Sequence, residues 1–590
     1  NSSPAPDIIG FTGIDLESVN GTIGESGAGL EVVQGPTGAL KARAAGTVWL
    51  VQTANDMRVD SVISIAGTAR LYSYGSIIDA FSDTGTDVTG VSIDLNSTAG
   101  GIGDSSKELD TDNGSGRFTA TAAGAIRLRE TAGDMRVGRV QAGQEVKLSA
   151  AQGSILDGSN DAFVKISGTD ITLVSDKAAI GSASDELEID TQGTGRLTAS
   201  ATTDAYITEK IGALKVTSVG AGANLRLSVA ESSGQGDDII LDSGSTVSGG
   251  KDVSLLAGDN ITVTAGAAVT AGTVLNLTGD KPSLDPEGSI ITIAGDLNAS
   301  TVSITAAAGQ GAKLVSSIDG NQELSNSQLK RTPASSTTVQ TIAIIGFTQA
   351  SLAGGASDNT MSIGGWTGSV TVDGGSGYDT ITVTTDTDFN IADGLIKRVG
   401  TGDATIIGIE NGVFRGGTKA NKFDVSGWTK AGQINGDLSP PKQNDTIISS
   451  GSGAFLLSGT ALKRAGTVDL VLGGIESAEL TGGAGDDLFD VSGWAGTGKI
   501  TGGLGIDTLV ASNDADMLLS DIALSRTAGK TSLGSMTLAG LESAQLTGGV
   551  SANKFTLSGW SGDASIAGNG GTGDSLVLTA DANYTLEASK

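Results

Sequence analysis

Acidic residues in glycine-rich turns are the side chains of this 590-residue chain best suited to chemistry. Three nine-residue segments share the pattern Gly-Gly-x-Gly-x-Asp-x-apolar-x, and they are GGSGYDTIT from Gly374, GGAGDDLFD from Gly482 and GGLGIDTLV from Gly502. Their sixth positions hold Asp379, Asp487 and Asp507, and Asp486 precedes the second of these. Carboxylates are hard oxygen ligands that suit Ca²⁺. The pattern predicts a calcium site at Asp487 and Asp507; the alternative is that Gly and Asp only form turns there.

Other acidic residues extend this pattern. Asp388 and Asp516 lie nine positions after the first and third of these aspartates, as expected if the opposite turn of a coil carries a second set of ligands. Asp574 occupies the diverged turn NGGTGDSLV, where Asn583 stands nine positions later. Three further turns carry Asn where Asp is expected, at Asn359, Asn421 and Asn553. Calcium is therefore not expected at every turn.

The three nonapeptides resemble the calcium-binding repeats of the repeats-in-toxin family of secreted bacterial proteins. In that family, glycines allow a tight turn, backbone carbonyls face the ion, and the sixth-position Asp supplies a carboxylate. The resemblance implies that Asp379, Asp487 and Asp507 are calcium ligands. Family sites usually combine consecutive nonapeptides, whereas each match in this chain stands alone within its coil.

The turns belong to a tandem repeat of about 66 residues. Trp366, Trp428, Trp494 and Trp560 are 62, 66 and 66 residues apart, and each follows a glycine. Three glutamates keep the same spacing, each six residues before a Gly-Gly pair, and they are Glu410, Glu476 and Glu542. Four arginines follow a similar spacing, and they are Arg331, Arg398, Arg464 and Arg526. A fixed period of this kind indicates supersecondary units stacked in a row.

The repeated tryptophans and arginines have structural and binding interpretations. Exposed indoles could stack on sugars, but regular placement favours tryptophans that cap the apolar core where a coil bends. The arginines are expected to form ion pairs at the coil edge, with the repeated glutamates as candidate partners. Both sets are therefore predicted to be structural.

The first 250 residues carry a longer period. ANDMRVDSV from Ala54 returns 78 residues later as AGDMRVGRV from Ala132, and more loosely as IGALKVTSV from Ile211. Segments such as EVKLSA and DITLVS alternate apolar and polar residues, which is typical of β-strands. No segment keeps a helical period.

These periods predict an all-β fold, an elongated parallel β-solenoid built from tandem repeats. We expect about four coils in each 78-residue repeat and about three in each 66-residue repeat. The Gly-Gly pairs at Gly482 and Gly502 are 20 residues apart, a spacing that would place these equivalent turns one above the other. The predicted organisation is an array over 1–250, irregular connecting coils over 251–318, and a second array over 319–590. An antiparallel sandwich would also give short strands, but its strands seldom repeat so faithfully.

Composition limits the possible functions. The net charge of −30 disfavours nucleic acid and anionic membranes as partners. The absence of histidine removes the commonest general base and zinc ligand, so an enzyme is not expected. The absence of cysteine excludes thiolate metal sites. No apolar run is long enough for a membrane helix, so membrane insertion of this segment is not expected.

The first array resembles filamentous-haemagglutinin-type β-helices in its style of coil. Both resemblances imply a secreted protein of the bacterial cell surface or extracellular matrix. The leading hypothesis is a rigid stalk or fibre segment of a giant surface adhesin, stiffened by calcium, that meets a neighbouring cell surface or polysaccharide. The alternatives are a filament, sheath or surface-layer subunit that associates laterally or end to end with its own copies, and a carbohydrate-active β-helix enzyme. The partial repeats at both ends lead us to expect a segment of a longer protein.

Overall fold

The computed structural model describes residues 5–25, 27–281, 288–307, 311–436 and 443–579. Its regular elements are all β-strands, and no α-helix occurs within those ranges. The all-β prediction is therefore confirmed. Likewise, no helix capable of crossing a membrane is found in the part of the chain just given.

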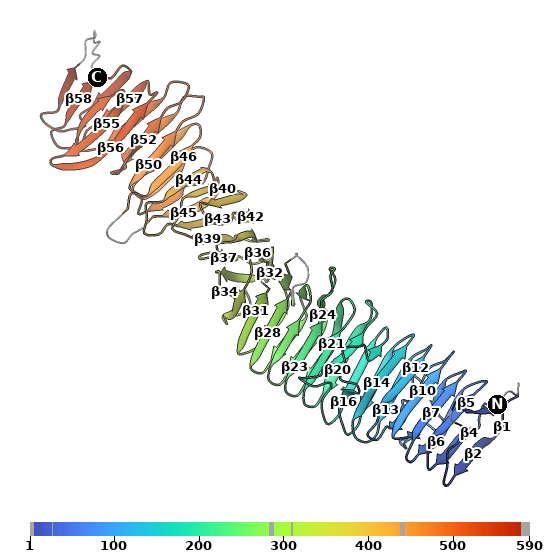
Figure 1. Cartoon of the computed structure of the whole chain (residues 1–590). Helices are drawn as coiled ribbons and strands as arrows, with labels where there is room; N and C mark the ends of the chain where they lie inside the picture. The colour runs from blue at the N-terminus through green and yellow to red at the C-terminus, as the bar shows by residue number, and fades with distance from the viewer. Residues whose placement is uncertain (1–4, 26, 282–287, 308–310, 437–442, 580–590) are drawn as a thin grey trace. The chain divides into compact units, whose positions relative to one another are not determined.

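The chain divides into two compact units, each a parallel β-solenoid (Figure 1). The first unit comprises residues 1–316 and 341–348, and the second comprises 317–340 and 349–590. Residues 251–316 belong to the first unit, where β25 (Val253–Leu256), β28 (Val274–Gly279) and β31 (Thr301–Ala306) continue one sheet strand by strand.

Each coil of the first unit supplies one strand, or a pair of short strands, to each of two sheets, which we name A and B. In sheet A, β5 (Val48–Gln52) pairs in parallel with β7 (Thr68–Ser73), which pairs with β10 (Ser92–Ser97). The register places Leu50 opposite Leu71 and Leu71 opposite Leu95. All three leucines are fully buried. Alternate side chains point inward because a strand has a period of two, and like residues stack from coil to coil.

The 78-residue repeat spans three and a half coils. Its strands are β6 (Met57–Ser64), β7, β8 (Ile77–Asp79), β9 (Val88–Thr89), β10, β11 (Leu109–Asp112), β12 (Phe118–Ala122) and β13 (Ile126–Glu130), and the next copy begins at β14 (Met135–Ala142). Strand β6 lies in sheet B, β14 lies in sheet A, and β22 (Leu214–Ala221) lies in sheet B again. The prediction of about four coils was therefore wrong, and successive copies face opposite sides of the solenoid.

The second unit also has two sheets, which we name C and D, and its 66-residue repeat spans two and a half coils. One repeat contains β44 (Lys422–Gly427), β45 (Ala431–Asn435), β46 (Thr446–Ser450), β47 (Ala454–Ser458), β48 (Ala461–Arg464), β49 (Leu470–Gly473) and β50 (Ser477–Thr481), and the next copy begins at β51 (Leu488–Gly493). Strands β47, β48 and β49 form an antiparallel meander inside the parallel sheet C. The prediction of three parallel coils was wrong because the meander uses residues without adding a coil.

Aromatic side chains stack between coils of the second unit. Phe455 of the meander lies over Phe489 with ring centroids 5.2 Å apart. Sixty-six residues earlier, Phe389 lies over Phe423 at 5.1 Å. The first stack is in sheet C and the second in sheet D, so copies alternate between sheets here too. These stacks fill the core that each meander covers.

Candidate functional site

The glycine–aspartate turns of the second unit build a ladder of side chains that accept backbone N–H groups from neighbouring coils. Each ladder has a first, a middle and a last position in chain order. From the first position, the amide of Asp487 donates to Asp507 Oδ1 at 2.8 Å. From the middle position, the amide of Asp507 donates to Oε2 of Glu542, the last position, at 3.0 Å. Each bond joins two adjacent coils, so the ladder satisfies turn amides that the sheet hydrogen bonds do not reach.

The same ladder recurs in the other repeats. Equivalent bonds join Asn359 N to Asp379 Oδ1 (2.7 Å), Asp379 N to Glu410 Oε2 (2.9 Å), Asn421 N to Asp445 Oδ1 (2.7 Å), Asp445 N to Glu476 Oε2 (3.3 Å) and Asn553 N to Asp574 Oδ1 (2.8 Å). The first position of a ladder holds Asn or Asp, the middle position holds Asp, and the last position holds Glu. The repeated glutamates therefore accept turn amides.

The side chain at the first position of each ladder also accepts a hydrogen bond from within its own turn. The side chains of Asn359, Asn421 and Asn553 accept the amide of the second glycine of the Gly-Gly pair, at 2.7–2.9 Å. Asp487 accepts the equivalent amide of Gly483 at 2.5 Å. The shared acceptor explains why Asn and Asp replace each other at this position.

The middle aspartates Asp379, Asp445 and Asp507 are the most deeply placed, whereas Asp574 is partly exposed. Asp379 and Asp507 are fully buried, and Oδ2 of each has no hydrogen-bond partner in the part of the chain that the structure describes. Burial raises the pKa of Asp507, while the hydrogen bond from the amide of Asp487 opposes that rise. Burial likewise raises the pKa of Asp379 against the amide of Asn359.

The remaining predicted ligands accept amides of neighbouring coils. Asp388 accepts from Lys422 N at 2.9 Å, and Asp516 accepts from Lys554 N at 2.8 Å. Asp486 accepts from Ile506 N at 2.8 Å. Asn583, the residue nine positions after Asp574 in the sequence, lies outside the described residues.

The structure brings Asp486, Asp487 and Asp507 onto two adjacent coils, as the 20-residue spacing predicted. Asp379 and Asp388 belong to a separate copy of the turn. Within the described ranges, no group of three or more His, Cys, Asp or Glu side chains is arranged to hold a metal ion. Calcium at these turns stays a prediction.

The tryptophans are core residues, as the regular spacing predicted. Trp366, Trp428 and Trp494 are at most 2% exposed. Each indole Nε1 donates to the carbonyl three residues later, at 3.1–3.2 Å. Trp560 makes the same bond at 3.3 Å but is only half-buried. The three buried indole rings therefore cannot stack on a sugar.

The arginines lie on the second strand of each meander and point into the solenoid. Arg398 Nη1 donates to the Trp366 carbonyl at 2.6 Å, and Arg526 Nη2 donates to the Trp494 carbonyl at 2.7 Å. Arg464 donates to the Trp428 carbonyl in the same way. The expected ion pairs with the repeated glutamates are therefore replaced by bonds to main-chain carbonyls.

Sequence reasoning missed Asp445, which is fully buried in the middle of its ladder. Its turn lacks the glycine pattern, but it lies 66 residues after Asp379 and 62 before Asp507. The repeat spacing alone would have identified it. The acceptor role of the glutamates needed the structure, because a sequence does not show which amide a side chain reaches.

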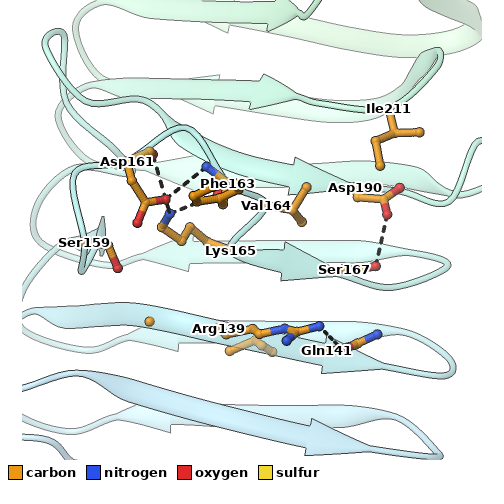
Figure 2. Close-up of a pocket in the computed structure, with 12 residues that line it drawn as sticks. Arg139, Gln141, Ser159, Asp161, Phe163, Val164, Lys165, Ser167, Asp190 and Ile211 are labelled. Atoms are coloured by element: carbon orange, nitrogen blue, oxygen red, sulfur yellow. Dashed lines mark hydrogen bonds and ion pairs between the residues drawn. The ribbon is translucent and has the colours of Figure 1, made fainter.

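A second polar feature lies in the first unit, where a pocket of about 510 Å³ opens beside Lys165 (Figure 2). Arg139 and Gln141 are joined at 2.7 Å on one wall. Phe163 is 77% exposed at the rim, and Asp161 contacts the Lys165 ammonium. The Lys165 ammonium bonds to Asp161, and the carboxylate of Asp190 accepts from Ser167, so these charged groups of the pocket already have partners.

Comparisons with protein-family models, with curated proteins and with solved structures found no match.

Proposed function

We propose that this chain is a rigid extracellular stalk or fibre segment of a large bacterial surface adhesin. The observation that carries the proposal is the parallel pairing of like strands from coil to coil, which repeats in both units with inward aliphatic ladders. Polar interior groups that recur from repeat to repeat suit a mechanical role, because each repeat then contributes the same hydrogen bonds between coils.

The resistance to stretching would come from bonds that join successive coils. Parallel sheet hydrogen bonds run along the solenoid axis, so a pulling force loads many of them together. The acceptor ladder adds side-chain bonds between the same coils, such as Asp487 N to Asp507 Oδ1. The arginines add a second set, such as Arg526 to the Trp494 carbonyl.

Calcium would stiffen the second unit at the turns of Asp487 and Asp507. The support for this proposal is the buried Oδ2 atom of Asp507, which has no hydrogen-bond partner among the described residues and lies one coil from Asp487. A hard cation would satisfy such an oxygen. Calorimetric titration of the calcium-free chain should release or absorb heat, and the double variant Asp487→Ala, Asp507→Ala should lose that signal.

We propose no catalytic role. The chain has no histidine, and the buried Asp, Glu and Arg side chains of the second unit form hydrogen bonds that recur with its repeat. Activity against uronic acid polymers would overturn this part of the proposal.

The location is tested with cells that produce the protein. Immunogold labelling with antibodies against each unit should place both units outside the cell, and removal of the gene should weaken attachment to a neighbouring cell or polysaccharide surface. Label confined to the cell interior would contradict the proposal. Electron microscopy of the purified chain should show straight rods, whereas flexible beads would contradict rigidity.

A second candidate, a self-assembling filament or surface-layer subunit, is favoured by apolar side chains on the outer face of one meander. Leu456 is 40% exposed and Val471 is 53% exposed, and both lie on strands of the same meander. Sedimentation at rising protein concentration distinguishes the two candidates, because ordered assembly that Leu456→Ser, Val471→Ser abolishes would favour the filament.

A further inference from the structure

Two copies of the 78-residue repeat hold the same buried polar site with opposite charge at its centre. Asp79, Asp87 and Asp110 of the first copy correspond to Asp157, Lys165 and Glu188 of the second. The backbones match, because Asp87 N donates to Asp110 O at 2.9 Å and Lys165 N donates to Glu188 O at 3.0 Å. A carboxylate therefore occupies the place of an ammonium.

The outer carboxylate of each site is oriented alike. Asp79 Oδ1 accepts the amide of Phe81 at 2.8 Å, and Asp157 Oδ1 accepts the amide of Ser159 at 2.6 Å. The first oxygen of each carboxylate thus faces the amide two residues later. Oδ2 of Asp157 contacts the Lys165 ammonium, and Oδ2 of Asp79 is the equivalent atom of the first copy.

In the second copy the centre is occupied by the protein's own cation. Lys165 is 2% exposed, and its Nζ lies 3.5 Å from Asp157 Oδ2 and 2.9 Å from the carbonyl oxygen of Phe163. It also pairs with the carboxylate of Asp161 (Figure 2). A buried carboxylate next to a buried ammonium is compensated in place.

In the first copy no ammonium takes that position. Asp79 Oδ2, the equivalent of the atom that faces Lys165, is buried and has no hydrogen-bond partner among the residues the structure describes. Asp110 is compensated by Lys107 at 2.7 Å and Arg129 at 3.5 Å. Asp79 and Asp87, which are 6% and 3% exposed, have no ion pair within those same ranges.

Two uncompensated carboxylates in one buried site are energetically unfavourable unless a cation or a proton joins them. Asp87 keeps one hydrogen bond, in which the amide of Asp110 donates to its Oδ2 at 2.8 Å. Asp87 stands where the second copy has Lys165, and Lys107 stands where it has Asp185, so the formal charge over these two positions is the same in both copies. The Lys107 ammonium pairs with Asp110 rather than with Asp79 or Asp87, so these two carboxylates still lack a cation among the described residues. A divalent cation would compensate both of them.

We propose that Asp79 and Asp87 bind a divalent cation of the Ca²⁺ type at the place that the Lys165 ammonium takes in the duplicate. Two carboxylates supply the charge, and backbone carbonyls and water complete the shell, as hard cations accept. Asp83, the equivalent of Asp161, stands at the exposed side of the site. The site is in the first unit, apart from the nonapeptide turns.

The test is hydrogen exchange of the full chain, read on peptides that cover β8 to β9. The metal-free protein is compared with protein in millimolar CaCl₂ and in NaCl of equal ionic strength. Calcium at about ten times its dissociation constant should slow local exchange about tenfold. No effect of calcium, or an equal effect of NaCl, would overturn the proposal, because the second result is only charge screening.

Two variants separate the proposed site from the calcium sites proposed for the second unit. Asp87→Lys should rebuild the Lys165 arrangement, so β8 to β9 should be protected without calcium and should not respond to it. Asp87→Asn should fold and lose the calcium response. A calcium response that survives in both variants would overturn the proposal. The peptide of β22 serves as the folding control in each case.

Discussion

Arg526 Nη2 donates a hydrogen bond of 2.7 Å to the carbonyl of Trp494, thirty-two residues earlier in the chain. The same guanidinium donates to the carbonyl of Val491 at 2.7 Å and to Asn513 Oδ1 at 3.1 Å. Arg526 is 1% exposed, and Trp494 and Val491 are at most 2% exposed, so water cannot replace the arginine as donor to these two carbonyls. The arginine therefore joins a meander to the coil that precedes it.

Arg526→Met should lower the free energy of unfolding of the second unit by about 2–4 kcal/mol, because two buried carbonyls and the partly buried Asn513 Oδ1 lose their donor. Urea unfolding followed by tryptophan fluorescence measures the loss, and hydrogen exchange should locate it in β54 (Asp516–Ser520) and β55 (Ala523–Ala528). The exposed residue Lys530 provides the control, and Lys530→Met should change stability by less than about 0.5 kcal/mol. Equal effects of the two variants would contradict the proposed role.

Gly502→Ala should destabilise the second unit, whereas Gly485→Ala should not. A Cβ at Gly502 would lie 1.7 Å from the carbonyl oxygen of Gly540 on the next coil, so the backbone would have to shift. A Cβ at Gly485 would meet nothing within 4 Å, and its φ is not positive. Thermal unfolding should show a clear loss for the first variant and little change for the second. Similar melting temperatures would contradict the close approach of the two turns.

Asp487→Asn should fold normally and keep its stability to within about 1 kcal/mol, because Asn already accepts the same glycine amide in the other repeats. The heat of calcium binding should fall in the same variant, since a carboxylate ligand is lost. Calorimetry and urea unfolding of one sample measure the two effects separately. Full calcium binding by a stable Asp487→Asn protein would remove Asp487 from the ligand set.

The first unit should lose stability as the pH rises. Burial raises the pKa of Asp87, Glu130 and Glu209 to about 8 and that of Glu188 to about 7. A carboxyl whose folded pKa lies above its unfolded pKa favours folding when protonated. Its contribution is therefore complete below about pH 4 and is lost as the pH rises through about 7 to 8. Melting curves of the calcium-free chain at pH 5 and pH 9 measure the difference.

Glu130→Gln tests this pH dependence at one residue. Glu130 is fully buried and accepts from Asn113 N at 2.9 Å and from Thr111 Oγ1 at 3.0 Å. The amide keeps an acceptor but cannot ionise, so the variant should gain stability relative to the wild-type protein at pH 9 and little at pH 5. Glu323→Gln, at an exposed position, should leave the profile unchanged. A stability that rises with pH in the wild-type protein would contradict the prediction.

The sequence determined the strand character, the two repeat lengths and the buried tryptophans. Inward residues such as Leu50 and Leu71 alternate with polar neighbours, and this pattern is local, so it is visible in the chain. The 20-residue spacing of Asp487 and Asp507 likewise predicted adjacent coils, because one coil has about that length. These features depend on neighbours in the sequence or on whole copies of a repeat.

Only the tertiary structure decided how many coils each repeat makes and which atoms the repeated side chains reach. An antiparallel meander such as β47 to β49 lengthens the repeat without adding a coil, so residue counts overestimate coils. In the first unit the 78-residue repeat spans three and a half coils, so its copies also alternate between sheets, as Met57 and Met135 do. The partner of Arg526 is a carbonyl, a group that every residue carries, and no sequence pattern distinguishes one carbonyl from another.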